Sequence, residues 1–303
     1  MKILITGGAG FIGSHLAARF AEKHDVWVLD DLSSGKMENL EGTRAHFIHG
    51  SILDSKTLRD LPENIDWVFH LAAMTSVADS MNDPHRCIAI NTSGTVRMLE
   101  WAKHHSIKKL VFASSASVYG DSLDLPKKEG MRPDPKSPYA VSKLDGEYFC
   151  RIFTHAFSLP TVCLRFFNVF GPRQNALSAY AAAMPVFFEK AIRNQEIEIH
   201  GDGSQTRDFI YIDDIVSGLA FVAECPEAQG VFNLGYGESI SINDLVQKIK
   251  ELTFSSSSIC YTPERSGDVK HSVAAVDEII KFGFKFSGNL EQGLAKLAAF
   301  YRG

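Results

Sequence analysis

The stretch TGGAGFIG, residues 6–13, decides the fold of this 303-residue chain. It follows the apolar run KILIT (2–6), which has the composition of a buried strand, and it opens the segment FIGSHLAARFAEKH (11–24), which has helical periodicity. Its glycines permit a tight turn between strand and helix. They also let backbone N–H groups approach a phosphate at the positive end of the helix. The stretch therefore predicts a dinucleotide-binding turn, although its spacing is GxxGxxG and not GxGxxG.

Outward from this turn, short apolar strands alternate with helices through the first half of the chain. Further strands are predicted at residues 26–30, 66–73, 109–115 and 161–169, and further helices at residues 55–61, 87–105 and 139–157. Strands that are apolar throughout, with helices between them, are typical of a parallel sheet covered on both faces. This part of the sequence therefore predicts an α/β protein with a doubly wound parallel sheet, the Rossmann arrangement.

The regular alternation ends after Gly171-Pro172. A smaller mixed α/β unit is predicted from a helix at 181–194, a strand at 196–203 and a helix after Ser241.

Two later apolar runs, FIYI (209–212) and VFNLG (231–235), are predicted to return to the main sheet. We therefore expect two interleaved domains. The nucleotide-binding domain covers residues 1–168 with return segments near 207–236, and the substrate-binding domain covers residues 169–303.

Asp30 ends the second predicted strand, where this fold places a carboxylate that accepts hydrogen bonds from the adenosine ribose hydroxyls. A 2′-phosphate would be repelled by Asp30 and by Asp31 beside it. The sequence therefore favours NAD over NADP as cofactor. A turn or helix-cap role for Asp30 is the alternative, and the preceding glycines weaken it.

The run SPYAVSK, residues 137–143, starts a helix with a serine cap and a proline in the first turn. Tyr139 and Lys143 then lie one turn apart on the same face. A tyrosine phenol is a poor base at its ordinary pKa of about 10, and a nearby cation lowers that pKa. The pair therefore predicts a general base, with core packing of the tyrosine as the alternative.

In this order the motifs resemble those of the extended short-chain dehydrogenase/reductases, and within them the nucleotide-sugar 4-epimerases. The resemblance covers essentially the whole chain, in TGGAGFIGSH, DDLSSG, HLAA, NTSGT, SSASVYG, YAVSK, LRFFNVFGPRQ, GDGSQTRDFIYIDD and RSGDVKHS. It implies epimerisation at C4 of a UDP-sugar through a transient 4-keto sugar, with tightly bound NAD that is regenerated in each cycle. Tyr139 would be the base, Lys143 would also hold the nicotinamide ribose, and Ser115 would share the hydrogen bond to the reacting oxygen.

The resemblance also assigns binding residues. The expected cofactor contacts are Gly7, Gly10, Phe11, Ile12, Gly13, Asp30, Asp31, Ser33, Ser34, Gly35, Ser51, Ile52, Leu71, Ala72, Ala73, Asn91, Tyr139, Lys143 and Phe167. The expected substrate contacts are Thr75, Ser115, Tyr139, Asn168, Ala183, Arg207, Arg265, Asp268 and Ser272. Arginine suits the diphosphate because its planar fork reaches two phosphate oxygens at once.

Three positions bear on the reaction and the sugar. Ala116 and Ser117 stand where related dehydratases carry an acidic pair and related decarboxylases a glutamate, so the sequence favours epimerisation over both. By the resemblance, the small side chain of Ser272 leaves room for a 2-acetamido group. UDP-glucose and UDP-N-acetylglucosamine, with their galacto epimers, are therefore the expected substrates.

Two departures from the family pattern leave alternatives open. Ser51 replaces an aspartate that meets adenine in many relatives, and Ala182 replaces an asparagine that contacts the nucleotide in some of them. Sugars linked to thymidine diphosphate or to GDP therefore remain alternatives to UDP-sugars as substrates. A nucleotide-sugar reductase, another epimerase of the family and a catalytically silent NAD-binding regulator are the remaining functional alternatives.

The composition excludes several other classes. The net charge of −5 gives no basic footprint for nucleic acid or an anionic membrane, and no apolar run approaches membrane-spanning length. Five scattered cysteines without a CxxC pair predict buried thiols in a reducing, cytoplasmic setting. No metal site is expected from the histidines. The resemblance implies a homodimer formed through the helices at 87–105 and 139–157.

Overall fold

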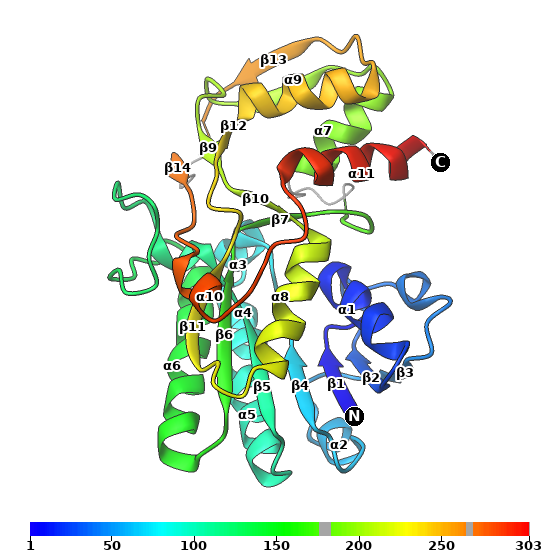
Figure 1. Ribbon diagram of the computed structural model, residues 1–303, viewed down its shortest axis with the longest axis vertical. Coiled ribbons are helices and arrows are strands. Elements are labelled where there is room, and N and C mark those ends of the chain that lie inside the picture. Colours follow the sequence, from blue (N-terminus) through cyan, green and yellow to red (C-terminus); the bar gives the residue numbers. More distant parts are fainter. Residues whose placement is uncertain (176–182, 265–268, 303) are drawn as a thin grey trace. The chain divides into compact units, whose positions relative to one another are not determined.

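The computed structural model describes residues 1–175, 183–264 and 269–302, and it divides the chain into two compact units (Figure 1). Unit 1 comprises Met1–Val118, Pro135–Phe166 and Val216–Phe232. Unit 2 comprises Tyr119–Asp134, Phe167–Ile215 and Asn233–Gly303, of which residues 176–182, 265–268 and 303 are not described.

Unit 1 is built on a sheet of seven strands in the order β11-β6-β5-β4-β1-β2-β3. The strands are β1 Lys2–Thr6, β2 Asp25–Asp30, β3 His46–His49, β4 Trp67–His70, β5 Lys109–Ser115, β6 Thr161–Phe166 and β11 Gly230–Leu234. From β3 through β6 all neighbours pair in parallel. The strand order reverses between β1 and β4, and ligands of doubly wound folds bind at the carboxyl ends of the strands at such a point.

Helices cover both faces of this sheet. They are α1 Phe11–Ala21, α2 Ser55–Arg59, α3 Val77–Asn82, α4 Pro84–Cys87, α5 Gly94–His104, α6 Pro138–Phe157 and α8 Ile212–Glu224, with single turns η1 Met37–Leu40, η2 Ile88–Ser93 and η3 Ala116–Tyr119. Side chains alternate between the faces, as a strand requires. Val68 lies in a core cluster with Met98 and Phe153, whereas the ring of Phe69 packs 5.3 Å from that of Phe20 in α1.

In its described residues, unit 2 contains three small sheets and four helices of its own. The strands are β7 Asn168–Phe170, β8 Ile197–His200, β9 Thr206–Arg207, β10 Phe209–Tyr211, β12 Ile240–Ser241, β13 Ile259–Thr262 and β14 His271–Ser272. The helices are α7 Ala183–Ile192, α9 Ile242–Thr253, α10 Asp277–Lys281 and α11 Leu290–Arg302. The sheets pair β10 with β7, β13 with β8, and β12 and β14 with β9.

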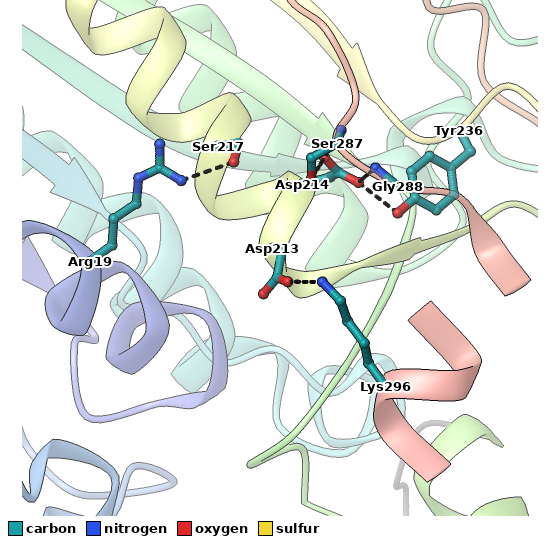
Figure 2. Close-up of polar contacts among 8 residues, drawn as sticks. All are labelled: Arg19, Asp213, Asp214, Ser217, Tyr236, Ser287, Gly288 and Lys296. Carbon is teal, nitrogen blue, oxygen red and sulfur yellow. Dashed lines mark hydrogen bonds and ion pairs between the residues drawn. The ribbon is translucent and has the colours of Figure 1, made fainter. Parts of the chain in front are cut away.

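A buried carboxylate joins the first turn of α8 to the loop before α11 within unit 2 (Figure 2). Asp214 accepts hydrogen bonds from the Tyr236 hydroxyl at 2.7 Å and from the Ser287 hydroxyl and N–H at 2.7 and 2.6 Å. Close by, Lys296 of α11 pairs with Asp213 at 2.6 Å. These contacts fix the C-terminal helix onto the rest of unit 2.

The predicted fold class is confirmed, and the strand at 161–169 and the run FIYI need correction. The strand divides into β6, in the main sheet, and β7, which pairs with β10 in a separate two-stranded sheet. The first three residues of FIYI form β10, which does not return to the main sheet because its backbone partner is the chain just after β6. VFNLG does return, as β11 beside β6.

Two further differences lie in the helix at 87–105 and in the domain bounds. The helix is not continuous, since a π-helical turn, η2, separates α4 from α5. Residues 119–134 cluster with unit 2, because the backbone of Lys127 bonds Val273 O and Ala275 N at 2.8 Å each. No helix of the described residues is long and apolar enough to cross a membrane.

Candidate active site

The glycine turn lies at the carboxyl end of β1, where the strand order reverses. Gly7 has a φ of +70°, which disfavours any other residue, and a Cβ there would lie 2.7 Å from Ala72 N. A Cβ on Gly13 would lie 2.3 Å from Gly7 O. Neither Gly7 nor Gly13 therefore has room for a side chain. The backbone N–H groups at the N-terminus of α1 remain available to bind a diphosphate.

Asp30 connects the glycine turn to the end of β2. Its two carboxylate oxygens accept hydrogen bonds from Ala9 N at 2.9 Å and Leu32 N at 2.8 Å. Burial raises the pKa of this carboxyl, and the two backbone hydrogen bonds act in the opposite direction. A carboxylate has about four acceptor sites, so ribose hydroxyls can still bind. Asp30 therefore orders the turn, and its contact with the ribose stays a prediction.

The remaining predicted cofactor residues of unit 1 surround this turn in different ways. Asp31 accepts hydrogen bonds from Ser33 N and Oγ, and a Cβ on Gly35 would lie 2.9 Å from the Ala9 carbonyl carbon. Ile52 is buried in the core cluster, so only its backbone remains for a ligand. The other members are half-buried or exposed: Phe11, Ile12, Ser34, Ser51, Leu71, Ala72 and Ala73.

The predicted catalytic residues Ser115, Tyr139 and Lys143 lie together in unit 1. Ser115 ends β5, and its side chain is a hydrogen-bonding partner of the Tyr139 phenol. Lys143 Nζ lies 5.6 Å from the Tyr139 ring centroid and donates to Ala113 O at 2.9 Å. Tyr139 is the second residue of α6, after the Ser137 cap, whose hydroxyl accepts a hydrogen bond from Ala140 N at 3.2 Å. The expected grouping is thus present at the carboxyl end of β5.

The pKa of Tyr139 does not shift in the direction that the sequence predicts. Burial lowers the pKa of Lys143 to about 8, with the nearby Cys87 raising it. Burial raises the pKa of Tyr139, while the hydrogen bond with Ser115 lowers it. In the protein alone the net direction for Tyr139 is therefore upward, because desolvation of a phenolate outweighs its partners. The positive nicotinamide of oxidised NAD is the further charge that would lower it.

His70 is a buried residue of the site that sequence reasoning missed. Its ring nitrogens lie 2.7 Å from Thr6 Oγ1 and 3.0 Å from Thr95 Oγ1, and the Thr6 hydroxyl also accepts from Ala72 N at 3.2 Å. Burial lowers the pKa of His70 to about 3, and Lys143 acts in the same direction. The neutral imidazole therefore joins the ends of β1 and β4 to α5. Its place in the strand-ending HLAA motif was the available signal.

Asn91 forms a second buried network. Its amide accepts from Met74 N at 2.7 Å and donates to Met74 O at 3.0 Å and to Ser142 Oγ at 2.9 Å. The expected cofactor contact of Asn91 stays a prediction, since the structure shows this side chain joining the loop after β4 to α6. Ser142 lies inside the YAVSK motif, yet sequence reasoning gave it no role.

Among the substrate residues predicted in unit 2, Arg207 and Ser272 lie on paired strands, and Asn168 lies on β7 in a separate sheet. Ser272 pairs in register with Arg207, and the Arg207 guanidinium donates to Thr206 O at 3.0 Å and Lys270 O at 3.2 Å. Asn168 donates through its amide to Asp208 O at 3.1 Å. Ala183 is exposed at the start of α7, and Phe167 is buried in unit 2. Arg265 and Asp268 lie outside the described residues, as does Ala182, while Thr75 is exposed in unit 1.

Comparison with known families now decides the class of this enzyme. Residues 3–235 match the model described as the NAD dependent epimerase/dehydratase family. The chain belongs to this family. Its cofactor is NAD, and the glycine turn that a Cβ would fill and the buried Asp30 carboxylate suit this dinucleotide.

Relatives of the enzyme include a UDP-glucose 4-epimerase of Mycolicibacterium smegmatis, 36% identical over 100% of this chain and 99% of the relative. A UDP-N-acetyl-alpha-D-glucosaminuronate decarboxylase of Bacillus cytotoxicus is 33% identical over 99% and 98%. The family thus contains more than one reaction type.

Two solved structures are similar over nearly their whole length. A UDP-N-acetylglucosamine 4-epimerase from Methanobrevibacter ruminantium, in complex with UDP-N-acetylmuramic acid, has a TM-score of 0.96 and 37% identity, with 99% and 98% coverage. A UDP-glucose 4-epimerase from Thermotoga maritima with UDP-glucose has a TM-score of 0.96 and 36% identity, with 100% and 99% coverage. The predicted family, fold and cofactor are confirmed.

Proposed function

We propose that this family enzyme interconverts the C4 epimers of a UDP-sugar through a transient 4-keto sugar. Support comes from the relatives named above as 4-epimerases and from the site itself. The observation that carries the proposal is the grouping of Ser115, Tyr139 and Lys143 in unit 1. A binding protein without catalysis has no need of all three.

The residues divide the proton chemistry among them. Tyr139, as phenolate, takes the proton of the sugar C4 hydroxyl and later returns it to the 4-oxygen. Ser115 donates a hydrogen bond to the reacting oxygen, while the Lys143 ammonium favours the charged phenolate. When bound, NAD supplies the hydride acceptor and donor. Tyr139 recovers its starting protonation state at the end of the cycle, so no external base is consumed.

The two residues before Val118 argue against the other reactions of the family. A 4,6-elimination needs an acid and a base beside the tyrosine, and Ala116 and Ser117 supply no carboxylate. The same two residues lack the glutamate expected of a decarboxylase by the resemblance stated above. Epimerisation requires only the serine, tyrosine, lysine and NAD.

The proposed substrates are UDP-glucose and UDP-N-acetylglucosamine with their galacto epimers. Arg207 and Ser272 support this assignment, because their strands pair in register within unit 2. The arginine would bind the diphosphate, and the small serine leaves space for an acetamido group. We also propose Asn168, Thr75 and Ala183 as substrate contacts, with Arg265 and Asp268 in the chain segment outside the described residues.

We further propose a homodimer in a reducing cytoplasm. All five cysteines are free thiols, which fits a reducing compartment. Helix α6 exposes apolar side chains that a second copy would cover, as the resemblance implies. Among the described residues, no cluster of three or more histidine, cysteine or acidic side chains could hold a metal.

The deciding experiment is an epimerisation assay with purified protein and no added cofactor. UDP-glucose and UDP-N-acetylglucosamine are offered separately, and the C4 epimers are separated by chromatography. Turnover of both without added NAD is expected, and acid-released NAD should be near one equivalent per chain. Tyr139→Phe should melt like the wild type and lose turnover. If Tyr139→Phe turned over normally, or if neither sugar reacted even with NAD added, the proposal would be wrong.

A further inference from the structure

The backbone N–H of Tyr139 has an unusual partner. The first N–H groups of a helix lack acceptors within the helix and need partners elsewhere. In α6, Pro138 has no N–H, Ala140 N donates to the Ser137 hydroxyl and Val141 N donates to Ser137 O. The N–H of Tyr139 alone among these crosses to another helix, where it donates to Ser80 Oγ at 3.2 Å.

Ser80 is held in place from both sides. It lies in α3, it is fully buried, and its hydroxyl donates to Val77 O at 2.6 Å. The hydroxyl proton is thereby committed, so the lone pairs are what Ser80 offers to Tyr139. Ser80 N itself donates to Ser76 O at 3.0 Å within the same short helix. The orientation of the Ser80 hydroxyl, which accepts the hydrogen bond from Tyr139 N, is therefore fixed.

The backbone carbonyl of Tyr139 is held in the same manner. Ser142, which is also buried, donates its hydroxyl to Tyr139 O at 2.8 Å. Ser80 and Ser142 thus fix the peptide groups on both sides of the Tyr139 Cα. With that Cα fixed, only the side-chain torsions remain to place the phenol beside Ser115.

We propose that Ser80 is a positioning residue for Tyr139, which fixes the main chain of the acid–base tyrosine so that its phenol stays at the Ser115 hydroxyl. The proposal deepens the function proposed above and rests on it for the role of Tyr139. It also gives α3 a role, because this helix connects the loop after β4 to the reacting tyrosine. That loop carries the proposed ligand contacts Leu71, Ala72, Ala73 and Thr75. Ser80 touches neither proton nor hydride in this role.

Loss of the acceptor has a defined consequence. In Ser80→Ala the N–H of Tyr139 loses its partner, the first turn of α6 shifts, and the phenol moves away from Ser115. Because the hydrogen bond with Ser115 lowers the pKa of Tyr139, that pKa is expected to rise. Small displacements of a reacting group cost about ten- to a hundredfold in rate, so kcat should fall by that factor with KM little changed.

The test follows the Tyr139 phenol directly by NMR titration of protein labelled with [ζ-¹³C]tyrosine, with Tyr139→Phe to identify the signal. Ser115→Ala serves as the reference for a lost phenol hydrogen bond. Ser80→Ala and the nearly isosteric Ser80→Cys should both raise the Tyr139 pKa in the same direction as Ser115→Ala. Because Ser80→Cys keeps the packing, it can be titrated in place of Ser80→Ala if the alanine variant does not fold.

The matched control is Ser76→Ala, which removes the α3 cap at Asp79 N without touching Tyr139. It destabilises the same helix and should leave the Tyr139 titration unchanged. An unchanged titration in both Ser80 variants would overturn the proposal, and so would an equal pKa rise in Ser76→Ala. The titration needs no substrate, so its outcome is independent of whether the wild type epimerises a UDP-sugar.

Discussion

The proposed role of Lys143 needs a positive charge, whereas its buried position disfavours that charge. Its ammonium is buried, and burial lowers its pKa from 10.5 in a free chain to about 8. Between those two values the unfolded chain binds more protons than the folded one, so the stability of the fold rises with pH across that window. Below pH 8 the full penalty is present, on the order of 3 kcal/mol for such a shift.

Replacing the lysine should therefore lower the activity and raise the free energy of unfolding. Lys143→Met should lower kcat by at least about a hundredfold, since it removes the cation beside Tyr139. Its advantage over the wild type in free energy of unfolding should shrink by about 2 kcal/mol between pH 7.5 and 9.5. Urea denaturation at a series of pH values measures this difference. Lys23→Met, which removes an exposed lysine, is the control. A constant advantage for Lys143→Met across this pH range would contradict the buried-charge account.

Ser272 allows the proposed sugar specificity to be tested at a single side chain. Ser272→Tyr fills the space proposed for the acetamido group, so the kcat/KM for UDP-N-acetylglucosamine should fall by about ten- to two-hundredfold. Turnover of UDP-glucose should persist, because that sugar has no acetamido group that would need the space beside residue 272. Ser272→Ala, which keeps the space, should retain both activities. Equal effects of the tyrosine on both sugars would remove Ser272 from the specificity assignment.

Helix α6 is attached to the sheet by a buried ion pair one turn after Lys143. Glu147 binds Arg165 of β6 through two hydrogen bonds, at 2.8 and 2.7 Å, and accepts from Ser114 Oγ at 2.5 Å. Both side chains are only 4% exposed. The arginine, the serine and Lys143 together set the position of α6 against the strand that ends at Ser115. The ion pair is therefore placed to maintain the geometry of the proposed catalytic residues.

Breaking this pair should destabilise the fold strongly. Glu147→Leu and Arg165→Met should each cost about 3–5 kcal/mol, because each leaves one buried charge without its partner. The double variant should cost less than the sum, and urea denaturation of the four proteins gives the coupling energy. The exposed pair Lys248–Glu291, at 41% and 75% exposure, is the control and should couple by less than about 1 kcal/mol. Additive single effects at Glu147 and Arg165 would refute the claim.

Elements with a strong local pattern were predictable from the sequence, and their distant partners were not. The run KLVFASS and the cap Ser137 carry their own signals, so β5 and the start of α6 were predicted well. FIYI is apolar enough for any buried strand, and only the folded chain shows that its partner is β7. Nothing local to Asn91 indicates Ser142, which is 51 residues away.

Across the whole molecule, the candidate site also divides into contiguous motifs, which the sequence predicts, and long-range contacts, which it does not. The glycine turn and the YAVSK motif are contiguous, so the sequence predicts their chemistry directly. His70 and Ser80 act through long-range contacts with Thr6 and Tyr139, respectively, 64 and 59 residues away. Buried polar residues of this kind look like ordinary strand and helix residues until their partners are known. Recognition of ordered motifs therefore indicated the proposed reacting groups and missed the buried polar residues in contact with them.

The surface of α6 supports the proposed homodimer. Val141, Tyr148 and Ile152 are seven and four residues apart, which places them on one helix face, and they are 42%, 43% and 50% exposed. Ile88 of the adjoining turn η2 adds another apolar side chain at 48% exposure. An apolar patch of this kind marks an interface, and in a two-fold symmetric dimer it would be covered by its own copy.

Ile152→Glu places a charge in this patch, and we expect it to convert the proposed dimer to a monomer at micromolar concentration. Light scattering coupled to size-exclusion chromatography gives the mass, and circular dichroism shows whether α6 remains folded. Phe254→Glu is the matched control, because Phe254 is 86% exposed but lies in unit 2, away from α6 in the sequence. It should leave the mass unchanged. A wild-type monomer, or a dimer that survives Ile152→Glu with its mass unaltered, would show that α6 does not form the interface.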